Sequence, residues 1–181
     1  MKQQCRIIGA LLVLSLAHPS AHGTAAERKL TGKFAGSIVS TAIDVDNNGA
    51  TSVLSTVRGK SSLGMTSSQT IGESAPQLPA VNTCPANNLE FPLLMAHSII
   101  HFEDLGDLLF ATYSSGVTCF DPTSGVFTTT GKGKFTSGTG TLSNATGSFE
   151  ATWQGKGIVR DRMGHEFDYL TGQVSGTIIT P

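Results

Sequence analysis

The sequence predicts an all-β protein built as a single eight-stranded antiparallel up-and-down β-barrel. Alternating apolar and polar residues recur in segments of strand length, with Gly-, Asn- and Pro-containing turns between them. No window shows the i, i+3, i+4, i+7 spacing of an amphipathic helix. Only 14% of the residues are charged, against about 25% in ordinary domains. A closed barrel leaves no exposed strand edge, and a β-sandwich is the alternative.

Residues 1–26 have the layout of a secretory signal peptide. Lys2 and Arg6 give a positively charged start, an apolar stretch follows at 7–17, and small residues then offer cleavage after Gly23 or Ala26. A buried N-terminal helix is the alternative. We expect a Sec-type route to the periplasm or the exterior, and one β-barrel domain over residues 27–181. No later apolar run reaches about 18 residues, so no integral membrane segment is expected after cleavage.

The first half of the domain contains three expected strands. They cover residues 30–45, 51–58 and 63–72, and an Asn47–Gly49 hairpin turn joins the first two. Alternation places Phe34 and Ile38 on one face of the first strand. It also places Val53 and Val57 together on one face of the second strand.

Residues 74–92 interrupt the alternation. The segment holds four prolines, which lack the backbone donor that a central strand needs. We therefore expect a long loop that folds across one end of the barrel. Five further strands are expected at 94–103, 108–120, 126–142, 147–160 and 166–180.

Two cysteines, Cys84 and Cys119, remain once the signal peptide is removed. In an oxidising compartment they are expected to form a disulfide that tethers the proline-rich loop. Two buried free thiols are the alternative.

The segment 131–150 is rich in glycine and threonine and predicts two paired strands joined by a small polar turn. Within it, Gly138-Thr139-Gly140 followed by Ala145-Thr146-Gly147 resembles the G-T-G-x-[FL]-x-x-A-x-G segment of the allene oxide cyclase and dirigent barrel superfamily. The nearest resemblance is to small bacterial secreted proteins of unknown function. The specific match covers about ten residues.

This resemblance implies the barrel fold and an interior able to hold a small ligand. The motif positions Gly138, Gly140, Ala145 and Gly147 are structural, because glycine permits positive φ and close strand approach. None of them can act as a nucleophile, an acid or a metal ligand. The resemblance therefore assigns no catalytic residue, and fold alone does not give function.

Oxygen ligands in the first predicted turn form a calcium candidate. Asp44, Asp46 and Asn48 match the first half of a calcium loop, but Ser55 stands where the loop needs a bidentate Glu. The alternative is a solvated hairpin turn. No other metal or cofactor is expected, because we interpret His97, His101 and His165 as residues of the barrel wall or rim.

The sequence does not show whether the remaining candidate side chains lie close to one another. Carboxylates at Glu150, Asp161, Glu166 and Asp168 are expected to be solvated rather than paired for acid–base work. Trp153 is expected in the core, with the wall of an apolar pocket as the alternative.

Three functions follow for this exported barrel. The expected one is non-enzymatic binding of a small apolar or amphipathic ligand; the alternatives are an allene-oxide-cyclase-like isomerase or cyclase, and a structural or interaction protein with a filled barrel. The chain has 12 Lys and Arg against 13 Asp and Glu and no basic cluster, which argues against a nucleic-acid partner. An open interior would favour ligand binding or catalysis, and a filled interior would favour the structural or interaction protein. The sequence does not predict the oligomeric state.

Overall fold

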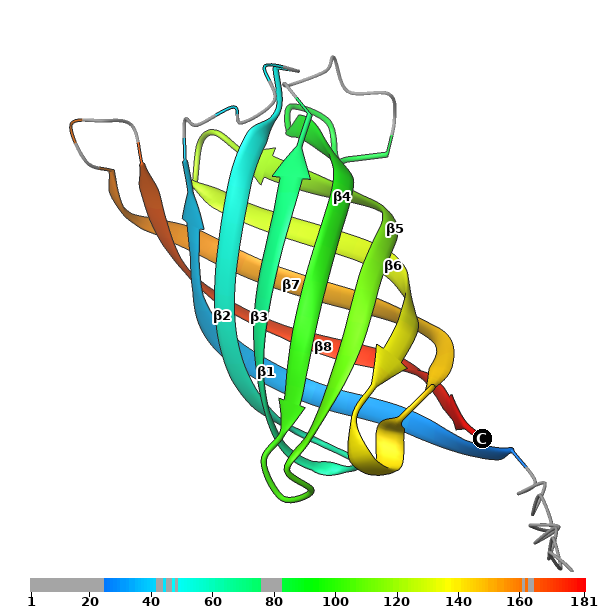
Figure 1. The fold of residues 1–181 in the computed structure, drawn as a ribbon. Helices are drawn as coiled ribbons and strands as arrows, with labels where there is room; N and C mark the ends of the chain where they lie inside the picture. Colours follow the sequence, from blue (N-terminus) through cyan, green and yellow to red (C-terminus); the bar gives the residue numbers. More distant parts are fainter. Residues whose placement is uncertain are drawn as a thin grey trace, which may run out of the picture.

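A computed structural model describes residues 25–41, 44, 47, 49–75, 83–160, 162 and 165–181. It is a closed eight-stranded antiparallel barrel (Figure 1). This confirms the predicted fold class; the alternative, a β-sandwich, was wrong. The strands are β1 (Ala26–Ser40), β2 (Thr51–Ser61), β3 (Gly64–Ser74), β4 (Leu89–Phe102), β5 (Asp107–Asp121), β6 (Val126–Gly138), β7 (Thr146–Arg160) and β8 (Glu166–Thr180).

Each strand pairs with the next along the chain, and β1 pairs with β8 to close the barrel. The closing ladder runs from Ala26 opposite Thr180 to Ser40 opposite Glu166. We call the upper end in Figure 1 the open end; it carries the β1–β2, β3–β4, β5–β6 and β7–β8 connections. The other end is the closed end, where β1 begins and β8 finishes.

Apolar side chains fill the barrel at the closed end. Phe102, Leu109, Leu142 and Ile178 are completely buried. They belong to one cluster with Leu30, Ala111, Phe135, Ala145, Phe149 and Ala151. Burial of this apolar surface is the main stabilising contribution of this half of the barrel.

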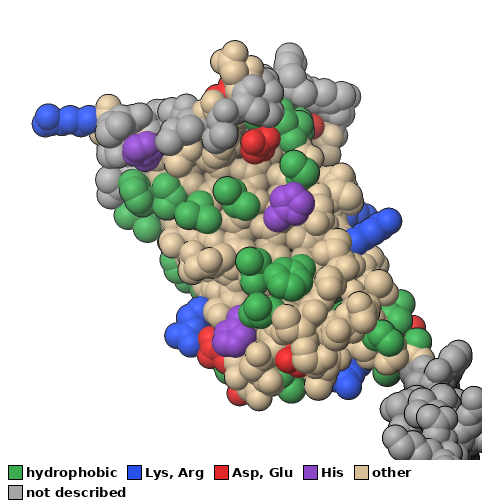
Figure 2. Space-filling model, viewed as in Figure 1, with side chains coloured by type: hydrophobic (Ala, Val, Ile, Leu, Met, Phe, Trp, Pro, Cys, Tyr) green, Lys and Arg blue, Asp and Glu red, His purple; other side chains and the backbone are tan. Residues whose placement is uncertain are grey.

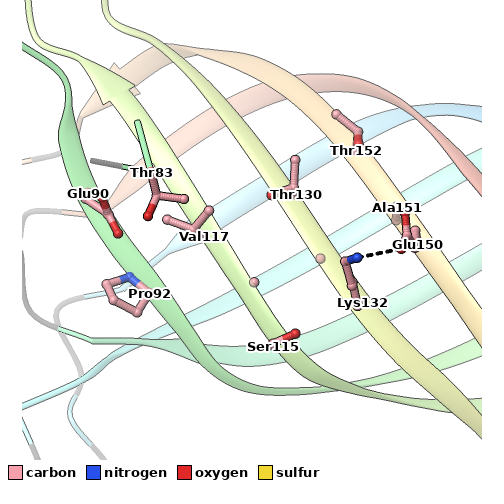
Figure 3. Close-up of a pocket in the computed structure, with 12 residues that line it drawn as sticks. Thr83, Glu90, Pro92, Ser115, Val117, Thr130, Lys132, Glu150, Ala151 and Thr152 are labelled. Atoms are coloured by element: carbon pink, nitrogen blue, oxygen red, sulfur yellow. Dashed lines mark ion pairs between the residues drawn. The ribbon is translucent and has the colours of Figure 1, made fainter. Parts of the chain in front are cut away.

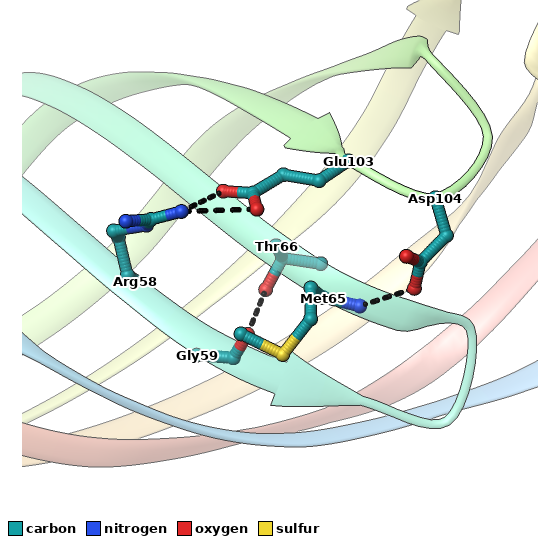
Figure 4. A network of polar contacts seen from close by, with 6 residues as sticks. All are labelled: Arg58, Gly59, Met65, Thr66, Glu103 and Asp104. Atoms are coloured by element: carbon teal, nitrogen blue, oxygen red, sulfur yellow. Dashed lines mark hydrogen bonds and ion pairs between the residues drawn. The ribbon is translucent and has the colours of Figure 1, made fainter.

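Hydrogen bonds also join the turns of the closed end to one another (Figure 4). Arg58 on β2 forms a bidentate ion pair with Glu103, with distances of 2.8 and 3.0 Å from Nη2 to the two carboxylate oxygens. The carboxylate of Asp104 accepts from the backbone N–H of Met65 at 2.9 Å, and the N–H of Glu103 donates to the Met65 carbonyl. The β2–β3 and β4–β5 turns are thus held together.

The connection from β6 to β7 contains a short 3-10 helix, η1 (Gly140–Leu142), where the sequence predicts a continuing strand. The prediction was wrong because Gly140 has φ of +53° and turns the chain out of the extended conformation. An ideal Cβ at Gly140 would overlap the carboxylate of Asp107. That carboxylate accepts from the N–H and the hydroxyl of Thr141 at 2.9 and 2.6 Å, so η1 is tied to the start of β5.

The other positions of the glycine motif are also close-packed. Ala145 is completely buried in the core. Gly147 has φ of +131°, and an added Cβ would overlap the Thr177 carbonyl of β8. These positions build the closed end of the barrel.

The loop predicted at 74–92 is shorter than expected, because β3 extends to Ser74 and β4 begins at Leu89. Pro92 stands inside β4, opposite Val117 of β5. The ladder tolerates it where pairing is irregular: the β3–β4 register shifts between Glu73 and Ser74, and β4 between Pro92 and Ala96 has no β5 partner. The carbonyl of Pro92 still accepts from Ala75.

Cys84 and Cys119 form a disulfide with a Cα–Cα distance of 5.5 Å, as the sequence predicts. It fastens the chain just before β4 to β5 near the open end. Residues 76–82 of the segment expected to cover this end lie outside the described residues, as do residues 1–24 of the predicted signal peptide. No helix among the described residues combines the length and the hydropathy needed to span a membrane.

Inside the barrel, aromatic rings lie against glycines of neighbouring strands. An added Cβ at Gly172 would fall 2.5 Å from the Phe34 ring, and one at Gly155 would fall 2.3 Å from the Phe127 ring. Gly133 stands in the same relation to Phe149. A glycine beside each ring leaves room for it to lie flat on the wall instead of projecting across the interior.

Candidate functional site: a cavity at the open end

Above the packed core the barrel interior is hollow. A cavity of about 880 Å³ occupies it, within the range of small-molecule sites. Its lining reaches Thr41, Gly49 and Gly125 at the strand ends and descends to Phe135 and Phe149 of the core. Phe34 and Ile38 share one face of β1, and Val53 and Val57 share one face of β2, as the alternation predicts; all four line this cavity.

The cavity has chemically different walls. Hydroxyl side chains line it from β2, β3 and β4, chiefly Ser55, Thr66, Ser68, Thr70 and Ser98. Aromatic and aliphatic side chains come mainly from β1, β4, β6 and β7. In the strand order of the barrel, β8 lies across from β4 (Figure 1), and β8 contributes two carboxylates. The cavity therefore suits a molecule with an apolar body and polar groups.

Tyr113 of β5 lies where the cavity meets the core. Its ring packs edge-on against Phe149 at 4.9 Å and against Trp153 at 6.1 Å between centroids. Burial raises the pKa of Tyr113 to about 12, although a hydrogen bond with Ser98 opposes the rise. The phenol therefore stays protonated at neutral pH. Ser98 also bonds Thr70 at 2.5 Å, so a chain of hydroxyls crosses β5, β4 and β3.

The prediction of a solvated carboxylate was wrong for Asp168. Its side chain lines the cavity and is only 8% exposed. Burial, and then the charge of Glu166, raise the pKa of the Asp168 carboxyl. The sequence was misleading because Phe167 and Tyr169 form the more hydrophobic face, yet these face outward and are 44% and 53% exposed. Leu170 lies on the same face of β8 as Asp168 and is buried, so it was the residue in the sequence that indicated which face points inward.

Of the other candidates from the sequence, Glu166 lines the same cavity as Asp168, whereas Glu150, His97 and His101 lie on the outer wall. Glu150 is on the outside of β7 and pairs with Lys132 at 2.7 Å, with both side chains exposed. His97 and His101 take outward positions on β4, where Nδ1 of His97 is 3.2 Å from the Thr112 hydroxyl. Asp161 lies outside the described residues. Trp153 packs on the core and also lines the cavity, so it serves in both expected roles.

The predicted calcium residues are only partly described. The carboxylate of Asp44 accepts from the backbone N–H of Gly49 at 2.7 Å, the bond that an Asp in a turn ordinarily forms. Asp46 and Asn48 lie outside the described residues, so calcium binding stays a prediction. No group of three or more His, Cys, Asp or Glu able to hold a metal occurs among the described residues.

A second pocket, of about 540 Å³, lies on the outer wall between β4 and β7 (Figure 3). Thr83 and Glu90 lie on one side of it, and the Lys132–Glu150 ion pair lies on the other. Its charged groups are paired or covered: Glu90 is 6% exposed and has an interaction partner. The barrel interior, with its larger volume and its aromatic lining, is the better candidate site.

The outer surface seen in Figure 2 is mostly neutral and polar. Hydrophobic side chains form small separate groups on it, and charged side chains gather toward its margins. Exposed apolar residues of β2, β3 and β4 include Leu54, Ile71, Met95 and Ile99.

No protein-family model matches this chain, and no curated protein matches it. Among solved structures, the pterocarpan synthase dirigent protein PsPTS1 aligns at 15% identity and a TM-score of 0.43, over 82% of this chain and 94% of that one. The pterocarpan synthase dirigent protein GePTS1 aligns at 15% identity and a TM-score of 0.42, over 86% and 91%. Both likenesses are too distant to indicate a function.

Proposed function

We propose that this protein binds a small amphipathic molecule inside the barrel. The observation that supports it is the cavity of about 880 Å³ lying on an aromatic floor, with hydroxyl groups along one wall. Rings and aliphatic groups there remove the apolar body of a ligand from water, and hydroxyls bond its polar groups. Binding needs no change in the filled half of the barrel, so the site is largely preformed.

The chain carries its own reporter for this binding. Trp153 is the sole tryptophan of the sequence, and it lines the cavity. N-phenyl-1-naphthylamine, a neutral aromatic probe, should brighten on entering the cavity and quench Trp153 emission by energy transfer. Micromolar affinity is expected, which corresponds to about −8 kcal/mol.

A matched pair of variants locates the site. Ser68→Phe places a ring in the cavity from β3, whereas Gln69→Phe places the same ring on the outer surface one residue later. We expect Ser68→Phe to weaken probe binding by roughly tenfold or more, about 1.4 kcal/mol, and Gln69→Phe to leave it unchanged. Equal affinities for the two variants would place the probe outside the barrel and contradict the proposal.

A second function, acid-assisted isomerisation or cyclisation, is favoured by one observation. Asp168 faces the cavity with a raised pKa, as a general acid or base in such a reaction requires. Deuterium exchange into 2-tetralone, an enolisable aromatic ketone, tests this. Exchange that the wild type accelerates and Asp168→Asn does not would support an enzyme, and absence of exchange in both would leave binding as the function.

A further inference from the structure

Asp168 occupies a distinctive position in the cavity wall. It lies opposite Ile38 of β1 and Gly157 of β7, neither of which has an ionisable side chain. An ideal Cβ at Gly157 would be 3.3 Å from Oδ1 of Asp168. The glycine therefore leaves space beside the carboxylate, and the carboxylate faces a volume large enough for a ligand.

The charge of this carboxylate has no compensating partner in the described structure. None of the described lining residues is Lys, Arg or His. The described residues donate no hydrogen bond to Asp168, and its one electrostatic neighbour among them is Glu166, which is also acidic. Ionising Asp168 in the empty cavity is unfavourable because burial removes water and Glu166 repels a second negative charge. The positive charge of a bound cation would offset both of these costs.

Aromatic rings line the same cavity. The ring of Phe127 lies over Gly155, the inward-facing residue of β7 that precedes Gly157. Trp153 lies on the same inward face of β7, two residues before Gly155 and therefore nearer the closed end. The faces of aromatic rings attract organic cations, most strongly where water is excluded. One carboxylate and several rings together form a site for a positively charged group on an apolar body.

We propose that the cavity selects amphipathic organic cations, with the cationic group beside Asp168 and the apolar body against the rings of Phe127 and Trp153. The proposal rests on the proposed function and adds the charge of the ligand. An organic anion would meet the Asp168 carboxylate and be repelled. A neutral ligand would gain the apolar contacts alone.

Three probes of matched size test the charge preference. They are phenylpropyltrimethylammonium, its neutral carbon isostere (4,4-dimethylpentyl)benzene, and the anion 4-phenylbutanoate. Affinities come from Trp153 emission and calorimetry on the full-length mature protein. We expect the cation to bind at least about tenfold more tightly than the neutral isostere, and the anion to bind most weakly. The cation is quaternary, so its charge does not change with pH.

Two variants identify the responsible carboxylate. Asp168→Asn should reduce the preference for the cation to less than about twofold while leaving binding of the neutral isostere unchanged. Glu150→Gln removes the same charge from the outer wall of β7 and should retain the full preference. Far-UV circular dichroism confirms that both variants are folded.

The outcomes separate this inference from the proposed function. Equal binding of cation and neutral isostere by the wild type, or a preference that survives in Asp168→Asn, overturns the cation site and leaves small-molecule binding intact. Failure of all three probes while N-phenyl-1-naphthylamine still binds also overturns the cation site alone. Failure of that probe as well overturns both proposals.

Discussion

At the closed end of the barrel, Phe102, Leu109 and Leu142 are completely buried, and the turns exchange hydrogen bonds with one another. At the open end the same strands enclose a cavity of about 880 Å³, and a disulfide fastens the chain before β4 to the wall. The contrast separates two tasks along one set of strands. Packing at one end stabilises the fold, so that the other end can leave apolar surface uncovered for a ligand.

The largest expected effect comes from the disulfide of the open end. Cys84 and Cys119 are 35 residues apart, and cross-linking a loop of this length contributes about 4 kcal/mol in the chain-entropy model. The double variant Cys84→Ser, Cys119→Ser should lower the free energy of unfolding in urea by this order. Hydrogen exchange should rise at residues 83–88 rather than at 138–146. An unchanged unfolding midpoint would show that the cross-link is not needed.

Equivalent truncations at the two ends should differ in cost. Leu142 is completely buried, whereas Leu89 lines the cavity and is partly exposed. We expect Leu142→Ala to reduce the free energy of unfolding by about 3 kcal/mol, because it leaves a void among packed side chains. Leu89→Ala should cost about 1 kcal/mol, because it only enlarges an existing space. Equal losses in urea unfolding would contradict the division into a packed and a hollow half.

The smallest expected effect on stability concerns Asp168 and depends on pH. Since its folded pKa is raised, the folded state binds more protons than the unfolded state between the ordinary value of 3.8 and the raised value. The stability of the ligand-free wild type should therefore fall as pH rises through this window. Asp168→Asn lacks this loss, so it should be the more stable protein at neutral pH. Glu166 is the acidic neighbour that adds to the effect.

The measurement is thermal unfolding of both proteins across the acidic range without ligand. The advantage of Asp168→Asn should shrink toward zero well below pH 3.8, where the wild-type carboxyl is protonated in both states. A wild type that is the more stable protein at neutral pH would show that its carboxylate has a stabilising partner.

Most of the fold was predictable because alternation and turn residues are local signals. All eight strands lie within a few residues of their expected ranges. The errors arose where a long-range contact decides the conformation. The carboxylate of Asp107 accepts bonds from Thr141 of η1, and a local irregularity in the pairing of β4 accommodates Pro92. Both features depend on pairing with residues distant in the sequence, which a local pattern does not show.

The site was less predictable because it depends on which face of each strand is inside. Local hydrophobicity favours the face of Phe167 and Tyr169, but Leu170, Val174 and Ile178 fix the opposite face of β8 inward. The sequence also does not show where packing stops. Trp153 satisfies both a core and a pocket assignment, since it lies at the boundary between the two halves.

The pairing of interior rings with glycines has a consequence for how this lumen could change over evolutionary time. Phe34 lies flat because Gly172 has no side chain, and Phe127 lies flat for the same reason beside Gly155. An added Cβ at either glycine would press on the ring and would also lie 2.6 Å from a backbone carbonyl, that of Thr152 for Gly172 and that of Tyr169 for Gly155, so the barrel wall itself would have to shift. The width of the lumen is thus set by its smallest residues, and these two glycines resist replacement because both a ring and a neighbouring strand occupy the space of a side chain.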